Sequence, residues 1–534
     1  MAARLRRWVA ACALDDPWLL LLLALAAGLL LTNLSSAILW NDEAGTALFA
    51  RNVLKFGYPR AYNGVNWIDP VTFQLTTGYR GDYLDVFHSW GPYYLLAVFF
   101  RLFGESTFIA RLPFAALGIV CVWATYRLAL TWFADRQSAR LAALLLALSV
   151  PFLLHARQCR YFTMQILFTL LALLAYERWI RTRRGAGWLF TALTLLLHSN
   201  HGTFLPVAGS LAVCGLTVDR HRLPRRAALW LAALLLATSV PWYIFANAGD
   251  HAQLGLNHMR QNLEFQIRTI NKYFAPVAFL GAVLLISRFR KRRFLFALSP
   301  GERRALQLIG IFFAVNLVFH CLIERRTIRY FIHILPVLLI LEGWLLVRWS
   351  QRGRVVPFLL GLLILWTNVL NRPTPAVLLA PFKPKVLETV RLRSYLAEFA
   401  YELTHDYEGP MEAAIRYLHA HADPGETVKI NYGDLELMFY LPDLVVQNGY
   451  FFQPQTFPKW IVYRKYWVPL EQQILAKRGV TGMDEYLAEI QRRYQRIELG
   501  AMDIQWENRP DDLDYHKFKT VTHGKPVVIY RLRD

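Results

Sequence analysis

Two adjacent acids, Asp42 and Glu43, directly follow a long apolar segment that ends at Trp40. A carboxylate held at the boundary between water and lipid could act as a general base and take the proton of a hydroxyl group. The alternative is that both acids begin a solvated helix, because acids stabilise a helix N-terminus and residues 44–57 have helical spacing. Position alone leaves both interpretations open.

Three arginines, Arg325, Arg326 and Arg329, precede Tyr330 at the start of a later apolar segment. Guanidinium groups match phosphate oxygens through paired hydrogen bonds and keep their charge, so this cluster suits a lipid phosphate. The alternative is that the side chains lie along the membrane interface with their charged ends in water. Weaker candidates of the same type are Arg157, Arg160, Arg260 and Arg268.

Two smaller polar groups are candidates for a donor or acceptor site. His198 and His201 flank a turn between two apolar segments, although ordinary hydrogen-bonded histidines at an interface give the same pattern. Asp82, Asp85 and His88 precede a Trp-Gly-Pro sequence. They could line an acceptor site or be ordinary loop residues, and their spacing does not separate these interpretations.

Metal and thiol chemistry have little support in the sequence. The polar segments that we place outside the membrane contain no DxD pair and no metal-ligand spacing, so we predict a metal-independent reaction without a cofactor. The five cysteines lie in or beside apolar segments and form no CxxC pair. Neither a zinc site nor a disulfide framework is indicated.

The residues above are separated by apolar runs of about 20 residues, which recur between residues 17 and 371. A helix of ~20 residues crosses a ~30 Å hydrocarbon layer, and only helices and closed barrels satisfy their backbone groups in lipid. With 55% hydrophobic residues in a chain of 534, disordered and collagen-like classes are excluded. We predict a polytopic α-helical membrane protein with a soluble C-terminal α/β domain.

We expect about eleven spans. They cover residues 18–40, 109–133, 138–157, 161–180, 187–199, 203–218, 226–247, 273–289, 305–323, 330–349 and 354–371. A long external loop, residues 41–108, follows the first span, which is too long for a cleaved signal. Within this loop the apolar stretch 93–103 is short and contains Arg101, so we place it along the membrane interface.

Charge sets the predicted orientation. The formal net charge is +21, and nearly all of the excess lies in short Arg-rich clusters between spans, which the positive-inside rule places in the cytoplasm. Nucleic-acid binding is therefore not needed to explain the positive charge. The N-terminus is then cytoplasmic, and an odd number of spans places the C-terminal domain outside the inner or plasma membrane.

The C-terminal tail has the pattern of an α/β domain. Helical spacing covers residues 412–421 and 484–493, whereas residues 427–431, 459–463 and 527–532 have strand character. No nucleotide-binding glycine loop, HExxH or GxSxG motif occurs in it.

Four sequence motifs together resemble the GT-C glycosyltransferases that use polyprenyl-phosphate sugars, namely the protein O-mannosyltransferases and the lipid A aminoarabinose transferase. They are WNDEAGTALFARNVLKFGYP after the first span, ESTFIARLPFAALG at the second, LLHARQCRYF at the end of the third, and IRYFIHILP late in the chain. The resemblance covers roughly the first 370 residues. Its specificity lies in the order and placement of motifs that are each weak alone.

The resemblance implies a GT-C-like membrane catalytic domain over residues 1–383 and an extracytoplasmic α/β domain over residues 384–534. It also implies that Asp42 is the catalytic aspartate with Glu43 as its neighbour, and that Arg329-Tyr330 contacts the donor phosphate. Relatives often have a second acid shortly after the ARxxR motif, whereas this chain continues from Arg160 with Tyr-Phe. Asp42 is therefore the main candidate base.

The function that follows is an inverting glycosyltransferase on the extracytoplasmic side, with a membrane lipid donor and an acceptor hydroxyl on a protein, lipid or glycan. One alternative is a transporter or lipid flippase, but its polar groups would lie near the membrane midplane and not at one face. The other alternative is a non-catalytic envelope assembly scaffold, which predicts that Asp42 and Arg329 tolerate substitution.

Overall fold

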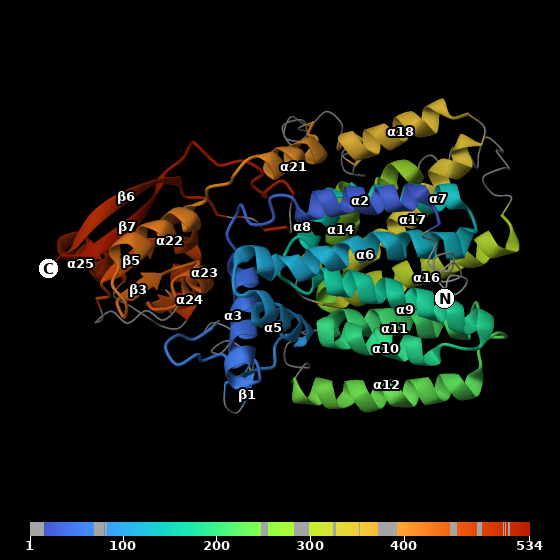
Figure 1. The fold of residues 1–534 in the computed structure, drawn as a ribbon, viewed down its shortest axis with the longest axis horizontal. Helices are drawn as coiled ribbons and strands as arrows, with labels where there is room; N and C mark the ends of the chain where they lie inside the picture. Colours follow the sequence, from blue (N-terminus) through green and yellow to red (C-terminus); the bar gives the residue numbers. More distant parts are fainter. Residues whose placement is uncertain are drawn as a thin grey trace. The chain divides into compact units, whose positions relative to one another are not determined.

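The computed structural model describes residues 15–68, 79–80, 83–246, 255–281, 298–323, 327–351, 353–371, 392–448, 457–477, 483–505, 507, 509–510 and 513–533. The chain forms two compact units (Figure 1). The first unit consists of Met1–Thr32 and Phe114–Ala400, and the second consists of Asn33–Pro113 and Tyr401–Asp534.

The first unit is helical. It contains α2 (Pro17–Leu31), α6 (Thr107–Phe133) from Phe114 onwards, α7 (Arg136–Ala147), α8 (Val150–Ala156), α9 (Phe162–Thr182), α10 (Ala186–Ser199), α11 (His201–Leu216), α12 (Arg225–Phe245), α14 (Met259–Thr269), α16 (Pro300–Leu322), α17 (Leu335–Ser350) and α18 (Val355–Trp366). Figure 1 shows α9, α10 and α11 running alongside one another, and the three helices contact each other.

Local sequence explains several helix starts. The Asp16 carboxylate accepts a hydrogen bond from the backbone N–H of Trp18, and Asp135 caps α7 in the same way. Ser299 and Glu302 form a reciprocal capping box at the start of α16. Each of these side chains satisfies backbone donors that the first turn of a helix leaves without partners.

The helices match most of the predicted spans within a few residues, with two corrections. The predicted first span, residues 18–40, is helical only to Leu31, and a separate helix begins at Asn41. The predicted span 138–157 is broken into α7 and α8, which meet at a bend of 62°. Pro151 in the first turn of α8 has no N–H to continue the preceding helix. Residues 282–289 of the predicted span 273–289 lie outside the described residues.

Within the described residues, four helices are long and apolar enough to cross a membrane, or five if the bent pair α7–α8 is one span. The four are Thr107–Phe133, Arg225–Phe245, Pro300–Leu322 and Ile332–Ser350. Several shorter apolar helices accompany them, including α10 and α11. The number of eleven spans stays a prediction.

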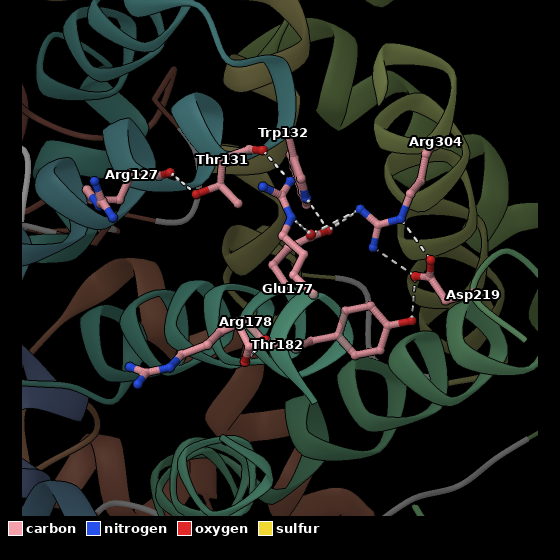
Figure 2. A network of polar contacts seen from close by, with 10 residues as sticks. Arg127, Thr131, Trp132, Glu177, Arg178, Thr182, Asp219 and Arg304 are labelled. Atoms are coloured by element: carbon pink, nitrogen blue, oxygen red, sulfur yellow. Dashed lines mark hydrogen bonds and ion pairs between the residues drawn. The ribbon is translucent and has the colours of Figure 1, made fainter. Parts of the chain in front are cut away.

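A buried ion-pair network joins several helices of the first unit (Figure 2). Arg304 at the start of α16 pairs with Glu177 of α9 at 2.9 Å and with Asp219, after α11, at 2.8 Å. The Trp132 indole N–H of α6 also donates to Glu177 at 3.0 Å. Both carboxylates are at most 2% exposed, so these contacts replace the water that the charges lose on burial.

The second unit contains α3 (Asn41–Phe56), α5 (Gly91–Phe103) and a short antiparallel pair, β1 (Tyr79–Arg80) with β2 (Leu84–Asp85). Its C-terminal part has α22 (Pro410–His421), α23 (Asp434–Tyr440), α24 (Val468–Lys477) and α25 (Met483–Arg493). The strands are β3 (Thr427–Ile430), β4 (Val445–Asn448), β5 (Trp460–Tyr463), β6 (Tyr494–Met502) and β7 (Pro526–Leu532).

These five strands form one mixed sheet in the order β4-β3-β5-β7-β6. β3 is parallel to both β4 and β5, whereas β7 is antiparallel to β5 and β6. The predicted helices at 412–421 and 484–493 and the predicted strands at 427–431, 459–463 and 527–532 all have observed counterparts. The tail therefore has the α/β secondary structure that its sequence pattern predicts.

Aromatic and small residues pack the N-terminal helices of the second unit against its C-terminal part. Phe49 of α3 meets Tyr93 of α5 at 5.0 Å between ring centroids, and Phe100 of α5 stacks on Phe439 of α23. A Cβ atom at Gly45 would lie 3.1 Å from Leu435, so a small residue allows α3 to approach α23 closely.

The apolar stretch 93–103 lies in the helix α5, and its predicted position along the membrane interface stays a prediction. Its buried face contains Leu96 and Phe100, whereas Val98, Leu102 and Phe103 are exposed. The division into a membrane domain ending at residue 383 and an extracytoplasmic domain from residue 384 stays a prediction.

Candidate functional site

The start of α3 is held by a buried ion pair between Glu43 and Arg111. Arg111 Nε donates to Glu43 Oε1 at 2.9 Å and its Nη2 donates to Oε2 at 2.6 Å. The remaining guanidinium hydrogen bonds reach the backbone carbonyls of Leu34, Ala37 and Ile38. Glu43 is fully buried and also accepts a hydrogen bond from the Trp40 backbone N–H. The pair therefore fixes the turn that precedes α3.

Asp42 lies in the first turn of α3, next to this pair, and is half-buried. Its backbone carbonyl accepts a hydrogen bond from the Thr46 hydroxyl at 3.1 Å. Its negative charge acts on Tyr432, whose pKa is raised mainly by burial and further by the charges of Glu436 and Asp42. Asp42 is thus on a firmly held helix end, close enough to Tyr432 for electrostatic coupling.

A small cavity lies beside this helix start. Its volume is about 10 Å³, and it is lined by Ile38, Trp40, Tyr432, Glu436, Gln505 and Glu507. Asn41, the residue before Asp42, donates to Glu436 Oε2 at 3.3 Å. Sequence reasoning missed Glu436 and Glu507 because only the fold brings them to α3 from about 400 residues away.

Burial controls the charge of the two cavity acids. Burial raises the pKa of Glu507 to about 7, against the opposing effect of Arg464, whose Nη2 lies 3.0 Å from Glu507 Oε1. Burial also raises the pKa of Glu436 well above its ordinary value, and the negative charges of Asp434 and Glu507 act in the same direction. Both groups therefore hold protons at a higher pH than ordinary glutamates do.

Asp85 and His88 organise the start of α5. Asp85 Oδ2 accepts a hydrogen bond from the Tyr93 hydroxyl at 2.8 Å, and Oδ1 accepts one from the backbone N–H of Phe87. His88 Nδ1 lies 3.7 Å from the same carboxylate. Asp85 is 1% exposed, so its contacts are those of a buried structural acid. Asp82 lies outside the described residues.

In the first unit, Arg329 lies on a short 3-10 helix, η4 (Ile328–Tyr330). Its backbone carbonyl accepts a hydrogen bond from Gln165 Nε2 at 2.9 Å, and its guanidinium lies 5.7 Å from the centre of the Tyr330 ring. Arg325 and Arg326 lie outside the described residues.

Gln165 also connects Arg329 to the turn between α10 and α11. Its Oε1 atom accepts hydrogen bonds from the Asn200 side chain at 2.8 Å and from the Thr203 hydroxyl at 3.0 Å. The structure therefore brings the Arg329 segment and the His198–His201 turn together through a buried glutamine. Sequence reasoning missed Gln165, because an uncharged residue inside an apolar helix has no distinguishing local pattern.

Both histidines of that turn face aromatic rings. The His198 ring lies 5.3 Å from that of Trp242, and the His201 ring lies 6.0 Å from that of Tyr243. The Tyr243 hydroxyl also donates to the His201 carbonyl at 2.5 Å. These contacts help to hold the turn.

The weaker arginine candidates have different surroundings. Arg157 Nη1 donates to the backbone carbonyls at the end of α2, those of Leu29, Leu30 and Thr32. This bond set satisfies helix-end acceptors that would otherwise lack donors. Arg160 is buried, with its guanidinium 5.2 Å from the centre of the Tyr161 ring.

The two remaining arginines lie on α14. Arg260 is exposed, and Arg268 forms an exposed ion pair with Glu264 one turn earlier. Among the residues that the structure describes, no group of three or more His, Cys, Asp or Glu side chains could hold a metal ion. The metal-independent reaction remains a prediction.

Part of the chain, residues 88–245, matches the family described as dolichyl-phosphate-mannose-protein mannosyltransferase. No match was found among curated protein sequences. The whole chain is similar in structure to ArnT from Cupriavidus metallidurans bound to undecaprenyl phosphate, with a TM-score of 0.58 and 17% identity, over 96% of this chain and 98% of that one.

The same protein in its apo state matches with a TM-score of 0.53 and 16% identity, over 96% of this chain and 97% of that one. An identity this low carries information on the fold alone. The predicted resemblance to GT-C glycosyltransferases is thereby confirmed for the fold: from end to end, this chain folds like ArnT.

Proposed function

We propose that this protein is an integral-membrane inverting glycosyltransferase that moves a sugar from a polyprenyl-phosphate donor to an acceptor hydroxyl. The fold shared with ArnT, whose structure holds undecaprenyl phosphate, and the mannosyltransferase match over residues 88–245 support this function. The strongest support for the transferase function is the position of Asp42 on a helix end that the buried Glu43–Arg111 pair fixes.

In this reaction Asp42 is the general base. Its carboxylate takes the proton of the acceptor hydroxyl while that oxygen attacks the anomeric carbon of the donor sugar. The bond from that carbon to the phosphate oxygen breaks, and the polyprenyl phosphate leaves with the electron pair. Attack from the face opposite the leaving group inverts the anomeric centre, and one positioned base is sufficient.

Glu43 acts through Arg111 and is a positioning residue in this proposal. Its two carboxylate oxygens are both occupied by the guanidinium, and the side chain is fully buried. A carboxylate held in this way does not reach a substrate. It fixes the start of α3, and a 1 Å displacement of the base there would slow transfer.

Arg329 is proposed to bind the donor phosphate, with Arg325 and Arg326 as further contributors. A guanidinium stabilises the charge that develops on the leaving phosphate, and its effect is large where water is scarce. Arg160 is a weaker candidate, and Arg157 is a poorer one because its Nη1 atom caps α2.

The proposed topology has about eleven spans, a cytoplasmic N-terminus and an extracytoplasmic C-terminal domain. The amphipathic helix α5, with exposed Val98, Leu102 and Phe103, suits a position along the outer interface. No metal or other cofactor takes part in the proposed reaction, and the donor is a membrane lipid.

The decisive experiment gives the purified full-length protein a panel of polyprenyl-phosphate sugars and candidate acceptors. Mass spectrometry then follows the loss of sugar from the lipid and its gain by an acceptor. Asp42→Asn should lower transfer by at least ~10²-fold while the protein keeps its thermal stability. The control is Asp443→Asn, which neutralises an exposed acid of the same unit.

Wild-type activity in Asp42→Asn would remove Asp42 from the mechanism. Arg329→Gln should reduce donor use more than acceptor use, which separate titrations of the two substrates measure. Equal binding of undecaprenyl phosphate to the wild type and to Arg329→Gln would contradict the phosphate role.

A further inference from the structure

The cavity beside α3 has a size and lining suited to one water molecule. Its volume of about 10 Å³ is close to the minimum that a single water requires. Glu436, Glu507 and Tyr432 line it, and each has a polar group that can hydrogen-bond to a water. Gln505, which also lines the cavity, is exposed and marks the side that faces solvent.

Trp40 provides an independent sign that the cavity holds a polar group. Trp40 is 4% exposed and lines the cavity, and its indole Nε1–H has no hydrogen-bond partner among the described residues. A buried N–H donor without an acceptor destabilises the folded state. A water in the cavity can accept a hydrogen bond from this N–H and donate hydrogen bonds to the carboxyl groups.

The cavity is close to the candidate base. Asn41, next to Asp42 in the chain, donates to Glu436, and Tyr432 is coupled electrostatically to both Glu436 and Asp42. Glu507, another residue of the lining, forms an ion pair with Arg464. The cavity therefore has Glu436 and Glu507 in its lining, lies beside the helix end that carries Asp42, and includes Gln505, which is exposed to solvent.

We propose that Glu507, through a water in this cavity, receives the proton that Asp42 takes from the acceptor. This inference rests on the proposed transferase function. In the forward step the acceptor oxygen loses its proton to the Asp42 carboxylate as the new C–O bond forms. The proton then moves through the water to the Glu507 carboxylate, and from there to bulk solvent, so Asp42 is ionised again for the next cycle.

The surrounding charges favour this direction of transfer. Burial raises the pKa of Glu507 to about 7, so this carboxylate can take up and release a proton near neutral pH. Burial raises the pKa of Glu436 well above its ordinary value, so Glu436 retains a proton more readily than an ordinary glutamate, and it serves as a hydrogen-bonding partner of the water. Further titratable or charged groups around the cavity acids are Tyr407, Glu412, Tyr432, Asp434, Asp503, Arg464 and Arg509.

The first test needs no substrate. Infrared difference spectra of the full-length protein, recorded from pH 5 to 9 in H₂O and D₂O, follow the C=O stretching band of protonated carboxyl groups. We expect a buried carboxyl that titrates near pH 7 and disappears in Glu507→Gln. It should persist in the control Glu498→Gln, which removes an exposed acid of β6. A spectrum without a group titrating near pH 7 overturns the proposal even if no variant folds.

The second test measures sugar transfer as a function of pH. Glu507 must be ionised to accept the proton, so wild-type kcat should rise through pH 7. In Glu507→Gln this rise should vanish and kcat should fall about tenfold, less than the ~10²-fold loss of a direct general base. Glu507→Asp should recover part of the rate, because it restores a carboxylate at the same position.

The two hypotheses fail in different ways. Activity of Asp42→Asn contradicts the transferase mechanism itself. Inactive Asp42→Asn together with a Glu507→Gln variant that keeps the wild-type rate and pH profile contradicts only the proton transfer through the cavity. Loss of the pH 7 rise in Glu507→Gln, with unchanged KM for donor and acceptor, supports it.

Discussion

The buried pair Glu43–Arg111 should contribute far more to stability than a second, exposed Arg–Glu pair in the same unit. Glu43→Gln keeps the shape of the side chain but leaves the charge of Arg111 buried without its counter-charge. Breaking a buried pair costs about 3–5 kcal/mol. Arg111 retains its three carbonyl partners, so we expect a loss near the lower end, about 3 kcal/mol.

The matched control is Glu105→Gln, which breaks the pair between Glu105 and Arg51. These side chains are 34% and 24% exposed, so water replaces the lost interaction and the expected change is at most about 1 kcal/mol. Thermal unfolding in detergent, followed by tryptophan fluorescence, measures both variants. For a unit of this size, 3 kcal/mol corresponds to a decrease of roughly 6–12 °C in the melting temperature.

Equal melting temperatures for Glu43→Gln and Glu105→Gln would refute this reasoning. Such a result would mean that the Arg111 carbonyl contacts alone balance the buried charge. The pair would then be free for another role, and the positioning function that we assign to Glu43 would lose its physical basis.

Three further outcomes are expected. Arg304→Gln should destabilise the first unit by about 3 kcal/mol, because the buried Asp219 loses this ion pair and Glu177 keeps only the half-exposed Arg181 as a cation. Arg181→Gln should change stability by less than ~1 kcal/mol in the same thermal assay, because Arg181 is about half exposed and Glu177 retains Arg304. Gly343→Ala should lower the melting temperature, because its Cβ would lie 2.9 Å from the Ala142 backbone nitrogen and overpacking costs about 1–3 kcal/mol. Burial lowers the pKa of Lys429 from its ordinary value of 10.5 to about 8 in the folded protein. Between pH 8 and pH 10.5, the unfolded chain therefore binds more protons than the folded one. Stability should therefore rise with pH across that window, by at most ~1.4 kcal/mol per pH unit, and Lys429→Met should abolish this rise in denaturant titrations at pH 8, 9 and 10.

Apolar runs predicted most of the helices, because a helix that is buried or in contact with lipid needs apolar residues along its whole length. It failed where the chain breaks within an apolar run, at Thr32 and again near Pro151, since local turns change the direction of a helix without changing its hydropathy. The short strand β4 and the strand β6, with four of its nine residues exposed, were not predicted for the opposite reason: their apolar pattern is weak.

The candidate site shows a different limit. Asp42 and Glu43 could be identified from their position, but their different surroundings depend on Arg111, which lies on another helix. Glu507 and Gln165 are also brought to their sites by tertiary contacts, and neither has an unusual local sequence. Motif order can indicate a chemistry, whereas the assignment of a base, a structural acid and a proton acceptor requires the packed structure.

The second unit is built from two chain segments, and this imposes an order on its folding. At ~5–20 residues per second, synthesis of the intervening segment takes roughly 15–60 s. During that time Glu43 and Arg111, both in the earlier segment, can already pair. The surface of α3 that faces Leu435 must wait for the later segment to emerge. In a nascent chain, the ion pair that supports Asp42 can thus form before the sheet of the same unit has been synthesised. Cleavage by a protease would be most damaging in this interval.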